Sequence, residues 1–150
     1  QMLTMDNDAS MFVSVVYAEY DLHTGELVVA NGGHNPPLLF TGEFSRFLDD
    51  LAGPILGPFP ESEYGQWRFT MTPGRTLVFY TDGVTEAQTQ EGVLYGEERL
   101  AKWSVRHHDL SVEAICHGIL EDVGEFSQGA PQFDDITILA FRVNKLRPPG

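Results

Sequence analysis

The sequence predicts an α+β fold, with strand hairpins in the first two thirds of the chain and helices in the last third. β-branched and aromatic residues fill short runs such as Met11–Tyr20 and Leu77–Tyr80, which is typical of strands. Near the C-terminus, apolar residues recur at three- and four-residue steps, which is typical of helices. Strands followed by helices, rather than alternating with them, indicate the α+β class. The length of 150 residues corresponds to one domain.

The first hairpin is predicted near the N-terminus. Met11–Tyr20 forms its first strand and Glu26–Ala30 its second. Between them, Asp21–Gly25 forms the loop, where Gly25 is free to adopt a positive φ. The sequence NGGHNPP (Asn31–Pro37) predicts a loop, since its two glycines and two prolines are unfavourable in a strand. Leu38–Phe40 then resumes as a short strand.

A second hairpin is predicted in the middle of the chain. Residues 42–65 contain much of the Gly and Pro, which predicts a long irregular surface segment that could dock a partner. After it, Trp67–Met71 and Thr76–Tyr80 read as two paired strands. They are joined by Thr72–Arg75, with Pro at position i+1 and Gly at i+2, as a type II turn requires.

Two helices and a final strand are predicted in the last third. Glu97–Val105 has helical spacing, and Ser111 is placed to cap a second helix. The buried face of that second helix is predicted to consist of Ile115, Ile119 and Val123. Ser127–Gln132 predicts a Gly/Pro loop, and Ile136–Val143 the last strand.

Composition restricts the classes of function. The net charge of −13 repels phosphate backbones, so nucleic acid is not expected as a partner. The single cysteine, Cys116, cannot form an internal disulfide and matches no zinc pattern with the five histidines, so we expect a buried structural thiol. There is no apolar run of membrane-spanning length and no secretory signal, so we expect a cytoplasmic protein. Because the chain begins with Gln1, we also expect that an N-terminal portion is missing.

Carboxylates at two strand ends suggest a metal site. Asp82 directly follows the run Leu77–Tyr80, with Glu86 four residues later, while Asp134 and Asp135 precede the last strand. Two carboxylates about 4 Å apart repel by roughly 4 kcal/mol at an effective dielectric constant near 20. Lys and Arg number nine against 22 acidic residues, so a divalent cation is the expected compensation. Sites made only of carboxylates favour Mg²⁺ or Mn²⁺ over zinc.

The residue types alone leave other interpretations open. Asp-Gly is a common turn pair, and Asp-Asp is common in loops. Glu86 by itself would be an ordinary acid in the first turn of a helix, and His34 a hydrogen-bonding loop residue. A nucleotide-processing enzyme is not supported, because no glycine-rich loop with a phosphate-binding lysine is present.

The order of three segments resembles one family. The series MFVSVVYAEYDLHTGELVVANGGHNPPLLF, GRTLVFYTDGVTEAQTQEGVLYGEERL and FDDITILAFRV is similar, over residues 9–143, to the SpoIIE/RsbU-type branch of the PPM (protein phosphatase 2C-like) phosphatases. The resemblance implies a β-sandwich flanked by helices (αββα), with two Mn²⁺ or Mg²⁺ ions at one edge. It also implies that a metal-activated water, rather than a catalytic side chain, attacks phosphoserine or phosphothreonine.

The resemblance assigns roles to individual residues. Asp82, followed by Gly83, and Asp134 match metal ligands of the family, and Asp135 is the neighbour of the second. Glu86 matches an acid near an additional, weaker metal ion. His34 stands where many relatives have an aspartate.

The family's first two metal-binding motifs would lie upstream of Met11 and are absent from this sequence. Residues 1–150 therefore resemble the C-terminal portion of a phosphatase domain. We expect this fragment to hold at most one metal ion weakly and to be inactive alone. Its exposed strand edge would be covered by upstream polypeptide or by a second copy in a homodimer.

The resemblance also implies a pathway. The expected substrate is a phosphorylated regulatory protein such as an anti-sigma-factor antagonist, in sigma-factor regulation of a stress response. The alternative is a catalytically silent PPM-fold module with a regulatory or interaction role. The acids Asp82, Glu86, Asp134 and Asp135 favour an active parent, because a silent scaffold has no need to hold these charges in one place.

Overall fold

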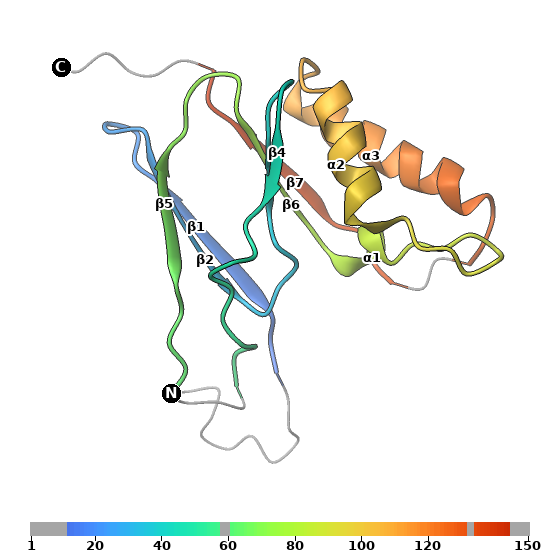
Figure 1. The fold of residues 1–150 in the computed structure, drawn as a ribbon, viewed down its shortest axis with the longest axis horizontal. Coiled ribbons are helices and arrows are strands. Elements are labelled where there is room, and N and C mark those ends of the chain that lie inside the picture. Colours follow the sequence, from blue (N-terminus) through green and yellow to red (C-terminus); the bar gives the residue numbers. More distant parts are fainter. Residues whose placement is uncertain (1–11, 58–60, 132–133, 145–150) are drawn as a thin grey trace. The chain divides into compact units, whose positions relative to one another are not determined.

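The computed structural model describes residues 12–57, 61–131 and 134–144, and these form two compact units. Of these residues, one unit contains 12–36, 48–57 and 61–72, and the other contains 37–47, 73–131 and 134–144 (Figure 1). Each unit has its own antiparallel sheet. Met11 and Gln132, at the ends of two predicted segments, lie outside the described residues. Among the residues that are described, no helix has both the length and the apolar character needed to cross a membrane.

The sheet of the first unit has the strand order β1-β2-β5. Its strands are β1 (Val15–Tyr20), β2 (Glu26–Gly32) and β5 (Gln66–Thr70). The hairpin predicted between β1 and β2 is confirmed. Gly25 has a φ of +72°, and its N–H donates to the carbonyl oxygen of Asp21 at 2.8 Å. The positive φ is the conformation for which glycine was expected at this position.

Strand β2 is longer than predicted, so the expected loop Asn31–Pro37 begins two residues too early. Asn31 and Gly32 both pair with β1, and Gly32 lies opposite Val15. A methyl group added to Gly32 would lie 3.3 Å from side-chain atoms of both Val15 and Tyr64. The glycine therefore continues the strand where neighbouring side chains leave little room, rather than ending it.

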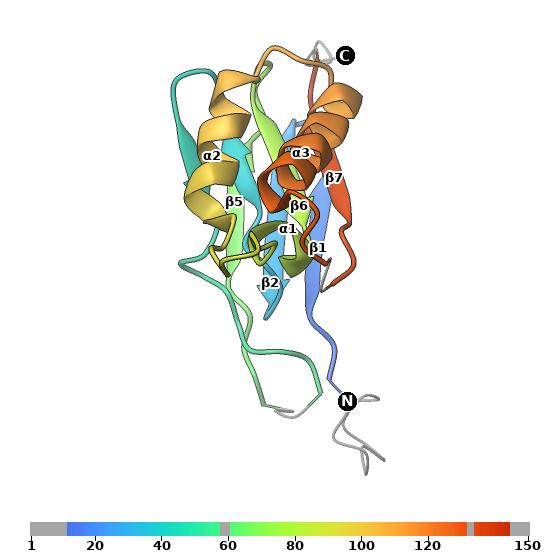
Figure 2. The same cartoon turned by 90° about the vertical axis from the view of Figure 1, so that its right-hand side faces the viewer.

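The second unit contains a sheet of order β4-β3-β6-β7 and all the helices of the described residues. The strands are β3 (Leu38–Phe40), β4 (Ser45–Phe47), β6 (Thr76–Tyr80) and β7 (Ile138–Arg142), and the helices are α1 (Asp82–Thr85), α2 (Gly96–Arg106) and α3 (Val112–Ser127). Helices α2 and α3 lie side by side over one face of this sheet (Figure 2). Their apolar faces and the sheet form one buried core, made of Leu38, Phe40, Val78, Tyr80, Val84, Tyr95, Leu100, Ile115, Ile119 and Val123.

The predicted helices are confirmed, with one addition. Ser111 caps α3, since its Oγ accepts a hydrogen bond from the N–H of Ala114 at 3.1 Å. The predicted buried face of α3 is buried in the structure. The addition is α1, a single helical turn that begins at Asp82, before the last third of the chain.

Two predictions for the middle of the chain are wrong. Residues 42–65 are not irregular throughout, because β4 forms within them and pairs with β3. The strands β5 and β6 do not form a hairpin; β5 pairs with β2, whereas β6 pairs with β3 and β7. Four of the five residues of β6 are fully buried, while β5 alternates between exposed and buried positions. Strand β6 lies between two hydrogen-bonded neighbours in one sheet, whereas β5 is an edge strand of the other.

Cys116 lies in α3 and is half-buried. Burial raises the pKa of its thiol, which keeps it protonated at neutral pH. We expected a buried thiol, whereas the thiol is half-buried in the structure, and its structural role stays a prediction.

Candidate metal-binding site

Asp82 stands where strand β6 turns into helix α1. Thr81 follows the last residue of the strand and occupies the N-cap position of α1, and Asp82 is the first helical residue. Asp82 is half-buried, and its Oδ1 accepts a hydrogen bond from the N–H of Gly83 at 2.9 Å. The aspartate is therefore held at the end of a central strand, which is a rigid support.

The second pair of predicted acids precedes β7. Asp134 and Asp135 are exposed, and Oδ1 of Asp134 accepts a hydrogen bond from the N–H of Asp135 at 2.7 Å. Because β7 pairs with β6 along its whole length, these acids come to the same end of the sheet as Asp82.

Thr81 joins the two acid-bearing loops. Its Oγ1 donates to the carbonyl oxygen of Asp135 at 2.8 Å and accepts from the N–H of Thr137 at 2.9 Å. The N–H of Thr81 also donates to the carbonyl oxygen of Thr137, at 3.1 Å. Gly83 permits the contact, since a methyl group there would lie only 2.7 Å from the carbonyl oxygen of Asp135. We call this set of contacts the Thr81 junction.

A cavity of about 460 Å³ opens beside the Thr81 junction. Three of the predicted site residues, Gly83, Glu86 and Asp134, line it. Apolar side chains from α3 and the segment before β7 form the rest of the wall, including Leu120, Val123 and Ile136. The structure thus brings Glu86 and Asp134 to one cavity, whereas Asp82 and Asp135 are not among the residues that line it.

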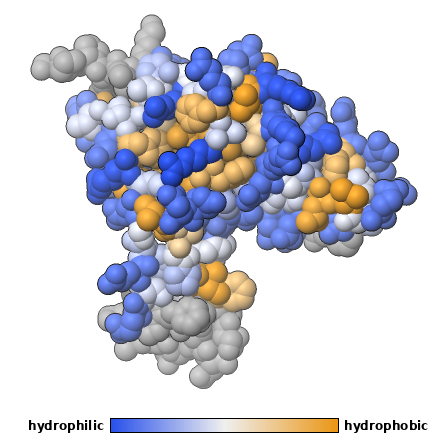
Figure 3. All heavy atoms as spheres, in the orientation of Figure 1, coloured by the Kyte–Doolittle hydropathy of each residue, from blue (hydrophilic) through white to orange (hydrophobic). Residues whose placement is uncertain are grey.

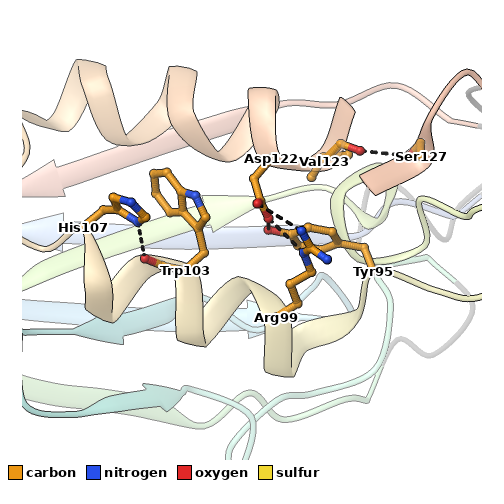
Figure 4. Close-up of polar contacts among 7 residues, drawn as sticks. All are labelled: Tyr95, Arg99, Trp103, His107, Asp122, Val123 and Ser127. Atoms are coloured by element: carbon orange, nitrogen blue, oxygen red, sulfur yellow. Dashed lines mark hydrogen bonds and ion pairs between the residues drawn. The ribbon is translucent and has the colours of Figure 1, made fainter. Parts of the chain in front are cut away.

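A polar cluster fixes the helix that forms the cavity wall. Arg99 of α2 donates to Asp122 of α3 through Nε at 3.0 Å and Nη2 at 3.1 Å, and the hydroxyl of Tyr95 donates to the same carboxylate at 2.7 Å (Figure 4). The Arg99 guanidinium also lies 4.8 Å from the ring centre of Phe126. At the C-terminal end of α3, the Ser127 hydroxyl donates to a backbone carbonyl at 3.0 Å. We call Tyr95, Arg99 and Asp122 the α2–α3 brace.

The brace changes the acidity of its members. Burial raises the pKa of Tyr95, and its hydrogen bond to Asp122 raises it further. Burial alone would raise the pKa of Asp122, but the hydrogen bonds from Arg99 and Tyr95 outweigh that effect and hold this pKa below its usual value. The Asp122 carboxylate is therefore committed to the brace and is charged at neutral pH.

The acids beside the Thr81 junction are of the type that suits a hard divalent cation. Glu86 and Asp134 line the cavity, and Mg²⁺ and Mn²⁺ prefer carboxylate oxygens as ligands. Within residues 12–57, 61–131 and 134–144, however, no three His, Cys, Asp or Glu side chains gather into a group able to hold a metal. The described part of the chain therefore contains no complete group of metal ligands of these types.

His34 belongs to the first unit and makes local hydrogen bonds. Its N–H donates to Oδ1 of Asn31 and its carbonyl accepts from Nδ2 of Asn31, both at 2.8 Å. Its ring Nδ1 lies 3.1 Å from Oγ of Ser14. These contacts agree with the predicted loop-stabilising role.

Sequence reasoning did not identify Thr81 as part of the site. The only local signal is that a hydroxyl residue separates the strand from Asp82, whereas the hydrogen-bonding partners of that hydroxyl lie 54 and 56 residues further along the chain.

Comparison with known proteins places the chain among phosphatase-related sequences. The family model described as Stage II sporulation protein E (SpoIIE) matches residues 1–144. Protein IcfG of Synechocystis sp. is 30% identical over 137 residues, which cover 91% of this chain and 22% of IcfG. The phosphoserine phosphatase RsbU of Bacillus subtilis is 29% identical over 136 residues, covering 90% of this chain and 40% of RsbU. The chain therefore spans less than half the length of either relative.

A solved structure has the same fold. The PP2C domain of SiaA from Pseudomonas aeruginosa superposes with a TM-score of 0.80 at 23% identity, covering 93% of this chain and 55% of that one. The likeness confirms the predicted α+β, PPM-type fold.

Proposed function

The chain belongs to the SpoIIE family, and we propose that the complete protein is a metal-dependent phosphatase acting on phosphoserine or phosphothreonine in a regulatory protein. The observation that carries this proposal is the Thr81 junction, which ties the loop of Asp82 to the loop of Asp134. On this proposal, residues 1–150 are the C-terminal portion of one phosphatase domain.

The oxygen donors of the two loops have distinct proposed roles. Asp82 and Asp134 would hold the Mn²⁺ or Mg²⁺, with Asp135 supporting Asp134 and Glu86 serving a weaker ion at the cavity. Ligands upstream of this chain would complete two metal sites. A bound ion of this kind lowers the pKa of water and offsets the charge of a phosphate group. The half-buried Asp82 is oriented by the N–H of Gly83, so that its carboxylate is positioned before a metal arrives.

The proposed substrate is a phosphorylated anti-sigma-factor antagonist. One support is that the relative RsbU is named a phosphoserine phosphatase. A second is that the net charge of −13 repels a phosphate group, so a bound metal ion would be needed to attract a phosphoprotein. Residues 42–65 are the proposed docking segment for this partner. A substrate that regulates transcription would place the reaction in the cytoplasm.

Charge removal at the two aspartates tests the function. In the complete protein, Asp82→Asn and Asp134→Asn should each abolish most Mn²⁺-dependent hydrolysis of a phosphoserine protein and of a small phosphate ester. Circular dichroism should show an intact fold, and the melting temperature without metal should stay level or rise, since repulsion between acids is removed. Asp109→Asn, at an exposed position outside the cavity, is the matched control and should keep wild-type rates.

Full activity in either aspartate variant would refute the assignment of ligands. If the complete wild-type protein shows no Mn²⁺-dependent hydrolysis at all, the alternative of a silent regulatory module is favoured instead.

A further inference from the structure

Thr81 makes contacts that a simple strand end does not need. It sits at the N-cap position of α1, where a threonine hydroxyl usually accepts a hydrogen bond from the helix backbone. No such capping bond forms here. Instead the hydroxyl is directed across to the segment before β7, where it donates to Asp135 and accepts from Thr137. The hydroxyl therefore donates one hydrogen bond and accepts one between the two loops, rather than within one loop.

The geometry points to Thr81 as the positioning residue for the metal ligands of both loops, an inference that rests on the proposed function. Thr81 is covalently adjacent to Asp82, and its hydroxyl bonds to the carbonyl of Asp135, the neighbour of Asp134. A displacement of this hydroxyl would leave the segment of Asp134 free to shift relative to Asp82, and the proposed metal needs both carboxylates. Thr81 touches neither phosphate nor metal in this role; it acts through the aspartates.

The main-chain contacts of the junction explain why the side chain is needed. One hydrogen bond, from the N–H of Thr81 to the carbonyl of Thr137, continues the ladder between β6 and β7. The carbonyl of Asp135 lies beyond that ladder and is bonded by the hydroxyl. Without the hydroxyl, the segment carrying Asp134 and Asp135 would lose its two side-chain bonds to the β6 end, while the strands would remain paired.

The test compares variants that differ in the hydroxyl. Thr81→Val keeps the branched shape and removes both hydrogen bonds, Thr81→Ser keeps the hydroxyl, and Thr81→Cys keeps a weak donor. Thr137→Val is the matched control, because Thr137 joins the junction through its backbone and its side chain is exposed. The readout is the affinity of the complete protein for Mn²⁺, which is measured from the electron paramagnetic resonance signal of free Mn²⁺. Circular dichroism checks that each variant is folded.

We expect Thr81→Val to bind Mn²⁺ about 10- to 100-fold more weakly than wild type, the range typical of groups that orient metal ligands. Thr81→Ser and Thr137→Val should have the Mn²⁺ affinity of wild type, and the affinity of Thr81→Cys should lie between those of Thr81→Ser and Thr81→Val. If Thr81→Val fails to fold, the comparison of Ser with Cys decides the question in the same way.

Three results would overturn the inference. They are a Mn²⁺ affinity of Thr81→Val equal to that of wild type, an equal loss of Mn²⁺ affinity in Thr81→Val and Thr81→Ser, or a loss of Mn²⁺ affinity in Thr137→Val as large as that in Thr81→Val. Failure of the proposed function looks different. In that case wild type itself binds no Mn²⁺ and hydrolyses no phosphate ester.

Discussion

Two buried tyrosines in the core of the second unit differ in what their hydroxyl groups contact. The hydroxyl of Tyr95 donates to Asp122 at 2.7 Å. The hydroxyl of Tyr80 is buried, and within the part of the chain that the structure describes it has no hydrogen-bonding partner. Burial raises the pKa of Tyr80, so the group stays neutral. A buried hydroxyl without a partner is unfavourable, whereas a hydroxyl bonded to a carboxylate stabilises the fold.

The same substitution should therefore have opposite effects at the two positions. Tyr80→Phe should raise the free energy of unfolding by about 1 kcal/mol, and Tyr95→Phe should lower it by about 2 kcal/mol. Urea denaturation of the complete protein measures both, and each variant serves as the control for the other. A loss of stability in Tyr80→Phe would mean that its hydroxyl has a partner after all.

At the residue scale, the sequence predicted the candidate acids better than the residue whose hydrogen bonds connect their two loops. Asp82, Glu86 and Asp134 are conspicuous because carboxylates at strand ends are unusual without compensation, and the structure brings Glu86 and Asp134 to one cavity. Whether they bind metal is still a prediction. Thr81 could not be found in this way, since its role depends on a partner 54 residues distant.

The α2–α3 brace makes one helix pair sensitive to acid. The pKa of Asp122 is lower in the folded protein than its ordinary value, mainly because the hydrogen bonds from Arg99 and Tyr95 outweigh the effect of burial. The stabilisation it provides is complete above the ordinary pKa of aspartate and is lost as the pH falls through the folded-state pKa. The packing of α2 on α3 should therefore weaken in acid.

The lowered pKa of Asp122 predicts a difference in the pH dependence of unfolding. Between neutral pH and the acid range, the free energy of unfolding of wild type should fall more steeply than that of Asp122→Asn, which has no carboxylate to protonate at this position. Denaturant titrations at a series of pH values measure the two slopes, and Asp109→Asn should keep the wild-type slope. Parallel curves for wild type and Asp122→Asn would contradict the prediction.

Elements were predicted more reliably than their partners. Leu38–Phe40 was located to the residue, and Ser111 caps α3 as expected, because both depend on local chemistry. The pairing of β5 and β6 was wrong because a Pro-Gly turn reverses the chain without determining which sheet the next strand joins. The buried pattern of β6 depends on strands far away in the sequence.

On the scale of the whole molecule, apolar surface lies open. Figure 3 shows hydrophobic side chains at the surface among the hydrophilic ones. Toward the N-terminal end of the described residues, the large side chains of Phe12 and Tyr17 are 62% and 56% exposed. Strand β1 is an edge of its sheet, with one hydrogen-bonded neighbour among the named strands of the described residues. An open edge beside exposed apolar side chains favours association.

We therefore expect the chain of residues 1–150, expressed alone, to self-associate and to show no Mn²⁺-dependent phosphatase activity. The net charge of −13 opposes association at low ionic strength, so moderate salt should increase it by screening. Light scattering with a phosphatase assay tests both points, and the complete protein is the control. A monomeric, active fragment would show that the ligands needed for catalysis lie within these 150 residues.

The distance along the chain between the two halves of the Thr81 junction also has a consequence for synthesis. The partners are 54 and 56 residues apart, so translation at about 5–20 residues per second synthesises the second loop roughly 3 to 11 seconds after the first. During that interval β6 can pair with β3 but not yet with β7. A nascent chain therefore cannot assemble the two acid loops, and any enzymatic activity built on them begins only after the last strand has left the ribosome.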